Sequence, residues 1–383
     1  MYIKKMCVAL LCLSSVTTIH GQTAASVLTP ASPAPMSPTV LVTTPQASSS
    51  DFQAPTYPSG VPVPEFISDP ETDGMKVRRA VESYSDLSLK GSKLRAIPPL
   101  LGTREIHKTY IRELYQVMWR ANDPIDLYVI RPVGVKRPPV ILFLYGFPTE
   151  TDRFKDDSWC QRVVQGGAAA VGFVSALTGQ RYNYRPRTED FISQLPESLT
   201  TTVHDVPFIL DYLNTRGDLD MSRVGMFGQG SGGAIAVLAT SIEPRIKVLD
   251  LLDPWGSWAE WFVESPLIQP QDRAKYSAPE FLKPLATLDP VAYLPDLKTR
   301  NIRIQWIDDE GDGKEVIAMM TAAAPLNTKV VRYATGRAMY EANSSGKLFT
   351  WISKELGAVP ASVDPLTPEA IKNAYGTAQG AKR

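Results

Sequence analysis

The stretch "RVGMFGQGSGGAIAVLATSIEP", residues 223–244, decides the fold of this chain. It begins with a short apolar run, 223–228, passes through a cluster of glycines, and continues as an apolar segment, 232–242. Small residues at such a junction let a buried strand turn sharply into a helix and present one side chain at the edge of an α/β sheet. The stretch therefore predicts a strand, a tight turn and a helix in the protein interior.

The segments on both sides repeat this alternation. A leading antiparallel pair is predicted at 110–119 and 125–133, where polar and apolar residues roughly alternate. Strands buried on both faces have near-continuous apolar sequences, and such runs occupy 139–147, 167–177, 223–228, 246–253, 302–307 and 328–334. Helical segments between and after them are 199–216, 232–242, 314–324 and 346–356. This order predicts an α/β fold with a parallel sheet and helices on both faces.

Residues from about 105 to 357 resemble the α/β-hydrolase superfamily, in the branch of prolyl oligopeptidases, dienelactone hydrolases and acetyl esterases. The resemblance is carried by "VILFLYGFP" at 140–148, "VHDVPFILDYLNTRGDLDMSRVGMFGQGSGG" at 203–233 and "IRIQWIDDEGD" at 302–312. It implies the α/β-hydrolase fold, with a mostly parallel twisted sheet, helices on both faces and a helical cap inserted at about 254–297.

In that family the nucleophile is the serine of a G-x-S-x-G turn. The motif letters fall here on residues 228–232, "GQGSG", so Gly230 occupies the nucleophile position. A hydrogen side chain does not attack a carbonyl. Two interpretations of Ser231 remain open: a displaced nucleophile, or a first-turn helix residue whose hydroxyl caps backbone N–H groups.

The base and the acid of the triad are expected after the elbow. No histidine follows residue 204, and Ala338 or an immediate neighbour holds the place that the resemblance assigns to the base. The acid position survives at Asp309 or Asp312, and Arg337 is a candidate ion-pair partner for it. A carboxylate without a histidine to orient has no catalytic task.

His204 is a candidate for a relocated base. It lies in the helical segment 199–216, where Pro207 indicates that the first turn is near. Its other interpretation is a helix-face residue that hydrogen-bonds locally. An active enzyme would have to pair Ser231 with His204 or with a carboxylate.

The cleft is expected at the carboxyl ends of the strands. Relatives carry His-Gly where Tyr145 and Gly146 stand, and an oxygen-binding corner of backbone N–H groups can persist there. Tryptophans at near-helical spacing open the cap, either as an aromatic wall over a ligand or as the core of the cap. The predicted oxyanion and cleft residues are Tyr145, Gly146, Phe147, Gln229, Gly230, Asp253, Trp255 and Trp258.

The ends of the chain differ from its middle. Residues 1–21 carry two lysines and an apolar run too short to span a bilayer, which indicates an export signal. Residues 22–66, rich in Pro, Ser and Thr, are predicted to be a disordered linker, 67–360 the folded domain, and 361–383 a polar tail. We therefore predict a periplasmic or secreted protein with no transmembrane span.

Composition narrows the function. Lys+Arg and Asp+Glu both number 40, and the zero net charge argues against a nucleic-acid partner. Motifs for zinc, nucleoside phosphates and dinucleotides do not occur in their required contexts, so we predict no metal and no cofactor.

The main functional prediction is a pseudoenzyme that binds a small molecule, peptide or protein through the former cleft. The first alternative is an active serine esterase or peptidase that uses Ser231 with a non-standard base. The second is a structural protein of the cell envelope whose cleft has no task. The oligomeric state stays open.

Overall fold

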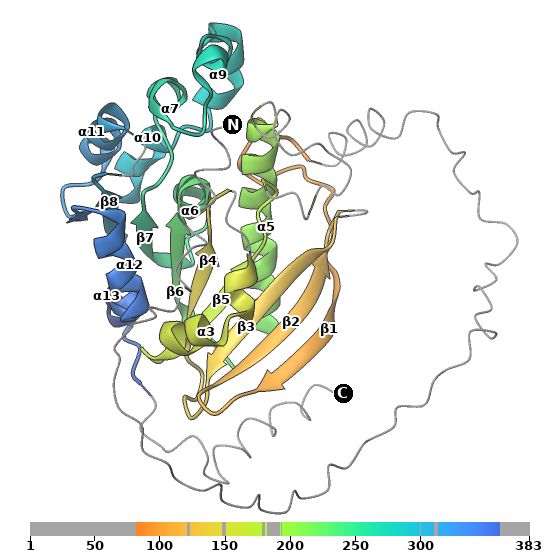
Figure 1. Ribbon diagram of the computed structural model, residues 1–383. Coiled ribbons are helices and arrows are strands. Elements are labelled where there is room, and N and C mark those ends of the chain that lie inside the picture. Colours follow the sequence, from red (N-terminus) through yellow and green to blue (C-terminus); the bar gives the residue numbers. More distant parts are fainter. Residues whose placement is uncertain are drawn as a thin grey trace, which may run out of the picture. The chain divides into compact units, whose positions relative to one another are not determined.

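Figure 1 shows a computed structural model of the chain, which describes residues 82–120, 123–147, 151–177, 181, 192, 194–298, 300–309 and 313–360. The predicted export signal 1–21, linker 22–66 and tail 361–383 lie outside the described residues, and so does Asp312. Within the described ranges, no helix combines the length and the apolar character that crossing a bilayer needs.

The described residues form one sheet with the order β1-β2-β3-β5-β4-β6-β7-β8-β9. Every neighbouring pair from β5 and β4 to β8 and β9 is parallel, whereas β1, β2, β3 and β5 pair antiparallel. The mostly parallel α/β sheet is confirmed. The strands are β1 (Ile97–Ile106), β2 (Tyr110–Met118), β3 (Ile125–Pro132), β4 (Pro139–Leu144), β5 (Ala169–Phe173), β6 (Asp220–Gln229), β7 (Ile246–Leu252), β8 (Asn301–Ile307) and β9 (Lys329–Tyr333).

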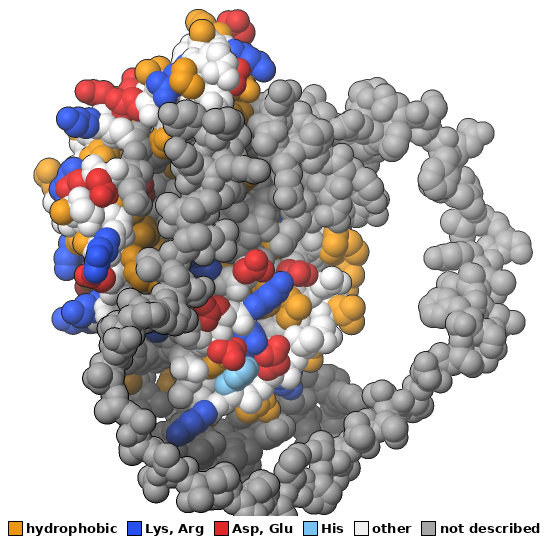
Figure 2. Space-filling model, in the orientation of Figure 1, with side chains coloured by type: hydrophobic (Ala, Val, Ile, Leu, Met, Phe, Trp, Pro, Cys, Tyr) orange, Lys and Arg blue, Asp and Glu red, His pale blue; other side chains and the backbone are white. Residues whose placement is uncertain are grey.

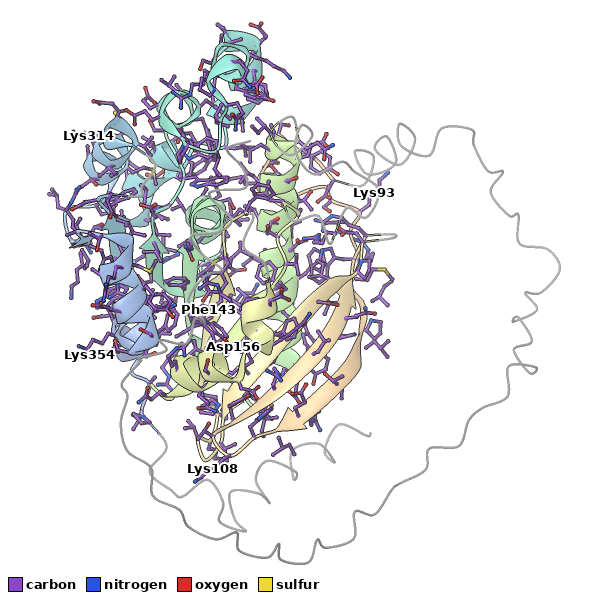
Figure 3. The ribbon with its side chains drawn as sticks, viewed as in Figure 1. Lys93, Lys108, Phe143, Asp156, Lys314 and Lys354 are labelled. Atoms are coloured by element: carbon purple, nitrogen blue, oxygen red, sulfur yellow. The ribbon has the colours of Figure 1, made fainter. Side chains whose placement is uncertain are left out.

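Helices cover both faces of the sheet (Figure 1). On β4, Val140, Leu142 and Leu144 pack into the cluster that contains the α5 and α6 side chains. Ile141 and Phe143 point the other way, into the cluster of α3 and α13, where Figure 3 labels Phe143 in the interior. These helices are η1 (Thr151–Lys155), α3 (Asp157–Val164), α5 (Leu195–Thr215), α6 (Ser231–Ile242), α11 (Lys314–Ala323), α12 (Gly336–Ser344) and α13 (Lys347–Glu355).

The cap lies between β7 and β8, beyond the carboxyl end of β7 (Figure 1). Its aromatic side chains pack on one another: Trp258 and Trp261 lie 5.9 Å apart between ring centroids, and Trp261 and Phe262 lie 5.2 Å apart. All three are buried, so they form the core of the cap. Its elements are α7 (Trp258–Glu264), η2 (Pro270–Asp272), α8 (Arg273–Tyr276), α9 (Pro279–Ala286), α10 (Pro290–Tyr293) and η3 (Leu294–Leu297).

The structure differs from the sequence-based expectations at one helix start and at one strand. Pro207 lies in the interior of α5, which begins earlier, at Leu195, with Pro196 in its first turn. A proline inside a helix costs about 3 kcal/mol, and the long buried face of α5 offsets this loss. The strand β1 was not predicted, because its ten residues are mostly exposed and include Pro98 and Pro99.

Candidate functional site

The elbow stands between β6 and α6. Gly230 follows the last residue of β6 and precedes the first residue of α6, with φ 55° and ψ −122°. Residues with a side chain rarely adopt this positive φ. The Gly230 N–H donates to the carbonyl of Leu252, at 3.0 Å, and the Gly230 carbonyl accepts from the N–H of Trp255, also at 3.0 Å. The structure therefore places Gly230 at the tight turn between β6 and α6, where the sequence resemblance leads us to expect a nucleophile.

The side-chain position of Gly230 faces an indole ring. A β-carbon built on Gly230 would stand 3.3 Å from Nε1 of Trp255 and 3.6 Å from Cα of Gly146. The ring of Trp255 is buried and lies 4.4 Å from the ring of Trp261 in the cap. The apex of the turn thus faces a buried ring, and glycine supplies no reactive atom there.

Glycines also bring the loop after β4 against the elbow. A β-carbon on Gly146 would lie only 2.7 Å from the carbonyl oxygen of Gln229, and one on Gly232 would lie 2.1 Å from that of Leu144. Real β-carbons do not approach so closely, so backbone meets backbone at both places. This packing holds the predicted oxyanion loop directly beside the turn.

Ser231 is the first residue of α6 and is 0% exposed. Its hydroxyl oxygen accepts a hydrogen bond from the backbone N–H of Phe147, at 2.9 Å. The hydroxyl thus caps a backbone N–H, which belongs to the loop after β4 rather than to α6. In this arrangement a substrate carbonyl has no direct access to the Ser231 oxygen, and one N–H of the oxyanion corner is already engaged.

Tyr145 turns away from the elbow. Its side chain is buried in the cluster beneath α3, and its hydroxyl accepts a hydrogen bond from Nε1 of Trp159, at 2.8 Å. Burial raises the pKa of Tyr145 to about 12, although Arg153, whose guanidinium carbon lies 4.6 Å from the ring centroid, acts in the opposite direction. Tyr145 therefore supports the loop and stays protonated at neutral pH.

The acid position contacts the loop in which a base is expected. Oδ1 of Asp309 accepts a hydrogen bond from the backbone N–H of Gly336, at 2.8 Å, at the start of α12. Ala338, two residues further, donates its N–H to the hydroxyl of Thr335. Arg337 donates to Glu341 one turn along the same helix. The carboxylate of Asp309 thus binds backbone where a triad acid would bind histidine.

The two described histidines have other partners. Nδ1 of His204 lies 2.8 Å from Oε2 of Glu82, and Nε2 lies 2.9 Å from the carbonyl oxygen of Asp86. His107 pairs with Glu105 and stacks on Tyr110. Sequence inspection gave no signal for the contact of His204 with Glu82, because the two residues are 122 positions apart.

The accessible part of the site combines an aromatic ring, an amide, a glycine and a carboxylate. Phe147, Gln229, Gly230 and Asp253 are partly exposed, whereas Gly146 and Trp255 are buried. Trp258 is buried too, and its Nε1 donates to the carbonyl of Leu288 inside the cap. Asp253 has a positive φ of 48°, and its N–H donates to the carbonyl of Gln305. We call the four partly exposed residues the elbow floor.

No metal site marks this region among the described residues. Across the part of the chain that the structure describes, no group of three or more His, Cys, Asp or Glu side chains is arranged to hold a metal ion. Figure 2 shows basic and acidic side chains interspersed over the visible face. The elbow floor is therefore the candidate site, and its chemistry is that of backbone groups and neutral side chains beside one carboxylate.

No protein-family model matches the chain. Among solved structures, an acetyl xylan esterase from Paenibacillus sp. R4 matches with 17% identity and a TM-score of 0.52, over 74% of this chain and 94% of its own. The methylesterase BT1017 matches with 13% identity and a TM-score of 0.52, over 79% and 70%. An acylaminoacyl peptidase from Pyrococcus horikoshii matches with 14% identity and a TM-score of 0.51, over 70% and 44%. At such identities the likeness concerns the fold.

Proposed function

Because this chain has the α/β-hydrolase fold with glycine at its elbow, we propose that it is an exported pseudoenzyme. It binds a small molecule, peptide or protein at the elbow floor and does not cleave it by acyl transfer. The observation that supports the proposal is the backbone of Gly230: this residue forms the tight turn between β6 and α6 at which the sequence resemblance predicts a nucleophile, and it has no side chain.

Acyl transfer needs a nucleophile, a base and donors for the oxyanion. The nearest hydroxyl, that of Ser231, is buried and bonded to the N–H of Phe147. Asp309 binds the backbone of Gly336, and His204 binds Glu82. Ser231, Asp309 and His204, the candidate components that the structure describes, are therefore each engaged in a structural contact.

Binding requires an accessible surface of fixed shape, but it requires neither a nucleophile nor a base. The elbow floor is partly exposed, and the backbone contacts at Gly146 and Gly232 leave the two loops little freedom to separate. A surface that is rigid before binding loses less conformational entropy when a ligand arrives. These features favour recognition at this edge of the sheet, and the apolar run near the N-terminus favours action outside the cytoplasm.

Reaction with a fluorophosphonate probe tests the proposal. We expect no covalent labelling of the full chain and no hydrolysis of p-nitrophenyl acetate above the background rate. Ser231→Ala is the informative variant. The matched control is Ser241→Ala on the same helix, because the Ser241 hydroxyl donates to the carbonyl of Leu238 within that helix. Stoichiometric labelling that disappears in Ser231→Ala alone would establish an active serine hydrolase instead.

A thermal-shift screen tests the binding half. Short peptides and small carboxylic acids are added to the unlabelled protein, and a ligand of the elbow floor raises the unfolding temperature in proportion to its saturation. Gln229→Ala should weaken that shift, because this side chain is partly exposed at the floor. A ligand shift that survives unchanged in Gln229→Ala and Asp253→Ala would place binding elsewhere.

A further inference from the structure

A buried group of charged side chains lies against α5, away from the elbow. It contains Glu82, Arg120, Asp123, Arg181, His204 and Asp205, and we call it the α5 clasp. Its side chains are at most 4% exposed. They come from separate parts of the chain: the segment before β1, the turn between β2 and β3, the connection after β5, and α5.

Two arginines connect the carboxylates. Arg120 binds Glu82 through two nitrogens, with one distance of 2.8 Å, and also contacts Asp205. Arg181 binds both oxygens of Asp123, at 3.0 and 2.7 Å, and the second oxygen of Asp205, at 2.7 Å. Paired guanidinium and carboxylate groups of this geometry are the strong form of a hydrogen-bonded ion pair.

Two carboxylates of the clasp, those of Glu82 and Asp205, are held in the charged form. Burial alone would raise the pKa of Glu82, but the hydrogen bonds and charges of Arg120 and His204 outweigh it, and the pKa is lowered. Asp205 behaves in the same way, since Arg120 and Arg181 lower its pKa against the effect of burial. Among the described residues of the clasp, three carboxyl groups face two guanidinium groups, and a buried net charge is costly.

The ring of His204 lies between two acceptors. One of its ring nitrogens faces the Glu82 carboxylate and the other faces the Asp86 carbonyl oxygen. Both partners are acceptors, so both nitrogens must carry hydrogen for the two bonds to form, and such a ring is an imidazolium. At the outer side of the ring, the Asp86 carboxylate and Lys90 belong to the exposed surface. Burial raises the pKa of the nearby Tyr293 in α10, and the Asp86 charge adds to this effect.

The imidazolium fastens the segment that precedes β1. We call residues 82–94 the N-terminal strap. Leu87 and Leu94 of the strap join the main hydrophobic core, and the hydroxyl of Thr200 in α5 donates to the strap carbonyl of Tyr84. The same clasp holds Arg181, which also donates to the carbonyl of Val174 directly after β5. Because β4, β5 and β6 run parallel, this connection starts at the same edge of the sheet as the elbow.

We propose that the α5 clasp is a pH-sensitive latch, in which the His204 imidazolium holds the N-terminal strap against α5 and loss of its proton releases the strap. When the ring loses a proton, a lone pair faces an acceptor oxygen and the clasp retains an unbalanced carboxylate. The closed form is thus favoured at lower pH, and it opens over the pH range in which the ring loses its proton. The Glu82 and Asp205 carboxylates stay charged over this range because their pKa values are lowered.

Trypsin cleavage of the strap in the full chain tests the latch. Lys90 and Lys93 are exposed, and Figure 3 shows Lys93 projecting outward, but cleavage requires the strap to leave its place. Between pH 6 and 9, with rates corrected by an unstructured reporter peptide, we expect cleavage to accelerate by up to about tenfold per pH unit, the limit for one linked proton. His204→Gln should cleave fast at every pH, and the control His107→Gln should follow the wild-type profile.

Two results would overturn the latch: a flat wild-type profile, or a His204→Gln profile with the wild-type slope. The ring nitrogens of the wild-type protein give an independent readout, because 15N chemical shifts distinguish imidazolium from neutral imidazole. In a variant that carries both His20→Gln and His107→Gln, the remaining His204 ring should lose its proton over the same pH interval in which the strap becomes cleavable. A neutral His204 ring in a protein whose strap resists trypsin would also refute the latch.

Discussion

The indole Nε1 of Trp255 lies 3.3 Å from the point where a β-carbon on Gly230 would stand. Trp255 lies at the start of the cap segment, just before α7, and Gly230 forms the turn between β6 and α6. The backbone N–H of Trp255 also donates to the carbonyl of Gly230. The space into which a nucleophile would project is therefore bounded by a buried ring. This contact makes the elbow and the cap one structural unit.

Gly230→Ser should destabilise the protein and fail to create a hydrolase. A side chain at this backbone geometry costs on the order of 1–3 kcal/mol, and the contact with Trp255 adds to that cost. Urea unfolding measures the loss. Gly217→Ser is the matched control, because Gly217 also has a positive φ, of 72°, but nothing lies within 4 Å of its added β-carbon.

The control should therefore lose less stability than Gly230→Ser. Equal losses at both positions would show that Trp255 does not constrain the elbow. Rapid turnover of p-nitrophenyl acetate by Gly230→Ser would show that a base is present after all.

Asp309→Ala should lower the free energy of unfolding by about 1–2 kcal/mol, because the buried Gly336 loses the acceptor of its N–H. Asp309→Asn keeps an oxygen at this place and should cost less. Hydrogen exchange at the Gly336 amide should accelerate in the alanine variant only. The control Asp308→Asn removes a partly exposed ion pair with Arg332 and should change stability by less than about 1 kcal/mol.

Asp205→Asn should cost about 3–5 kcal/mol, because it leaves Arg120 and Arg181 with an incomplete buried partner. Asp211→Asn on the same helix is the control. Its carboxylate is 70% exposed in its pair with Arg245, and such pairs contribute at most about 1 kcal/mol. Guanidinium chloride or urea unfolding at neutral pH separates the two variants, and equal effects would contradict a buried role for the clasp.

Acid denaturation should depend on the same carboxylate. The folded protein lowers the pKa of Asp205 below the unfolded value of about 3.9. The proton therefore binds more weakly in the folded state, so this group contributes stability above about pH 4 and the contribution is lost as the pH falls. Stability of Asp205→Asn should consequently decline less steeply with acid than that of the wild type. An unchanged acid slope would contradict the assignment.

Trp258→Ala should lower the free energy of unfolding by about 3–5 kcal/mol, because the ring is 2% exposed and packs inside the cap. Val263→Ala on the same helix, where the side chain is 48% exposed, should stay within about 0.5 kcal/mol of the wild type. Thermal or urea unfolding provides the comparison. A small effect of Trp258→Ala together with lost ligand binding would indicate an aromatic wall instead of a core.

Much of the fold was predictable because it follows from neighbouring residues. Apolar runs such as 302–307 indicate strands buried on both faces, and β8 occupies Asn301–Ile307. The turn at Gly230 was predictable from its glycines. The strand β1 was not, since its exposed residues and two prolines lack a strand pattern and its place depends on pairing with β2. The residues of a strand do not by themselves identify the neighbouring strand with which it will form hydrogen bonds.

In the candidate site, too, some features follow from the sequence and others only from the folded structure. The linear order of residues is enough to establish that glycine stands at the nucleophile position and that no histidine follows the elbow, because both are statements about residue identity. The orientation of Tyr145, the hydrogen bond from Phe147 to Ser231 and the ring of Trp255 beside Gly230 emerge only when the sheet brings separate segments together. Glu82 and His204, 122 positions apart, meet for the same reason. Short-range patterns are imposed by the covalent chain, whereas these contacts arise from burial, which depends on every element packed around them.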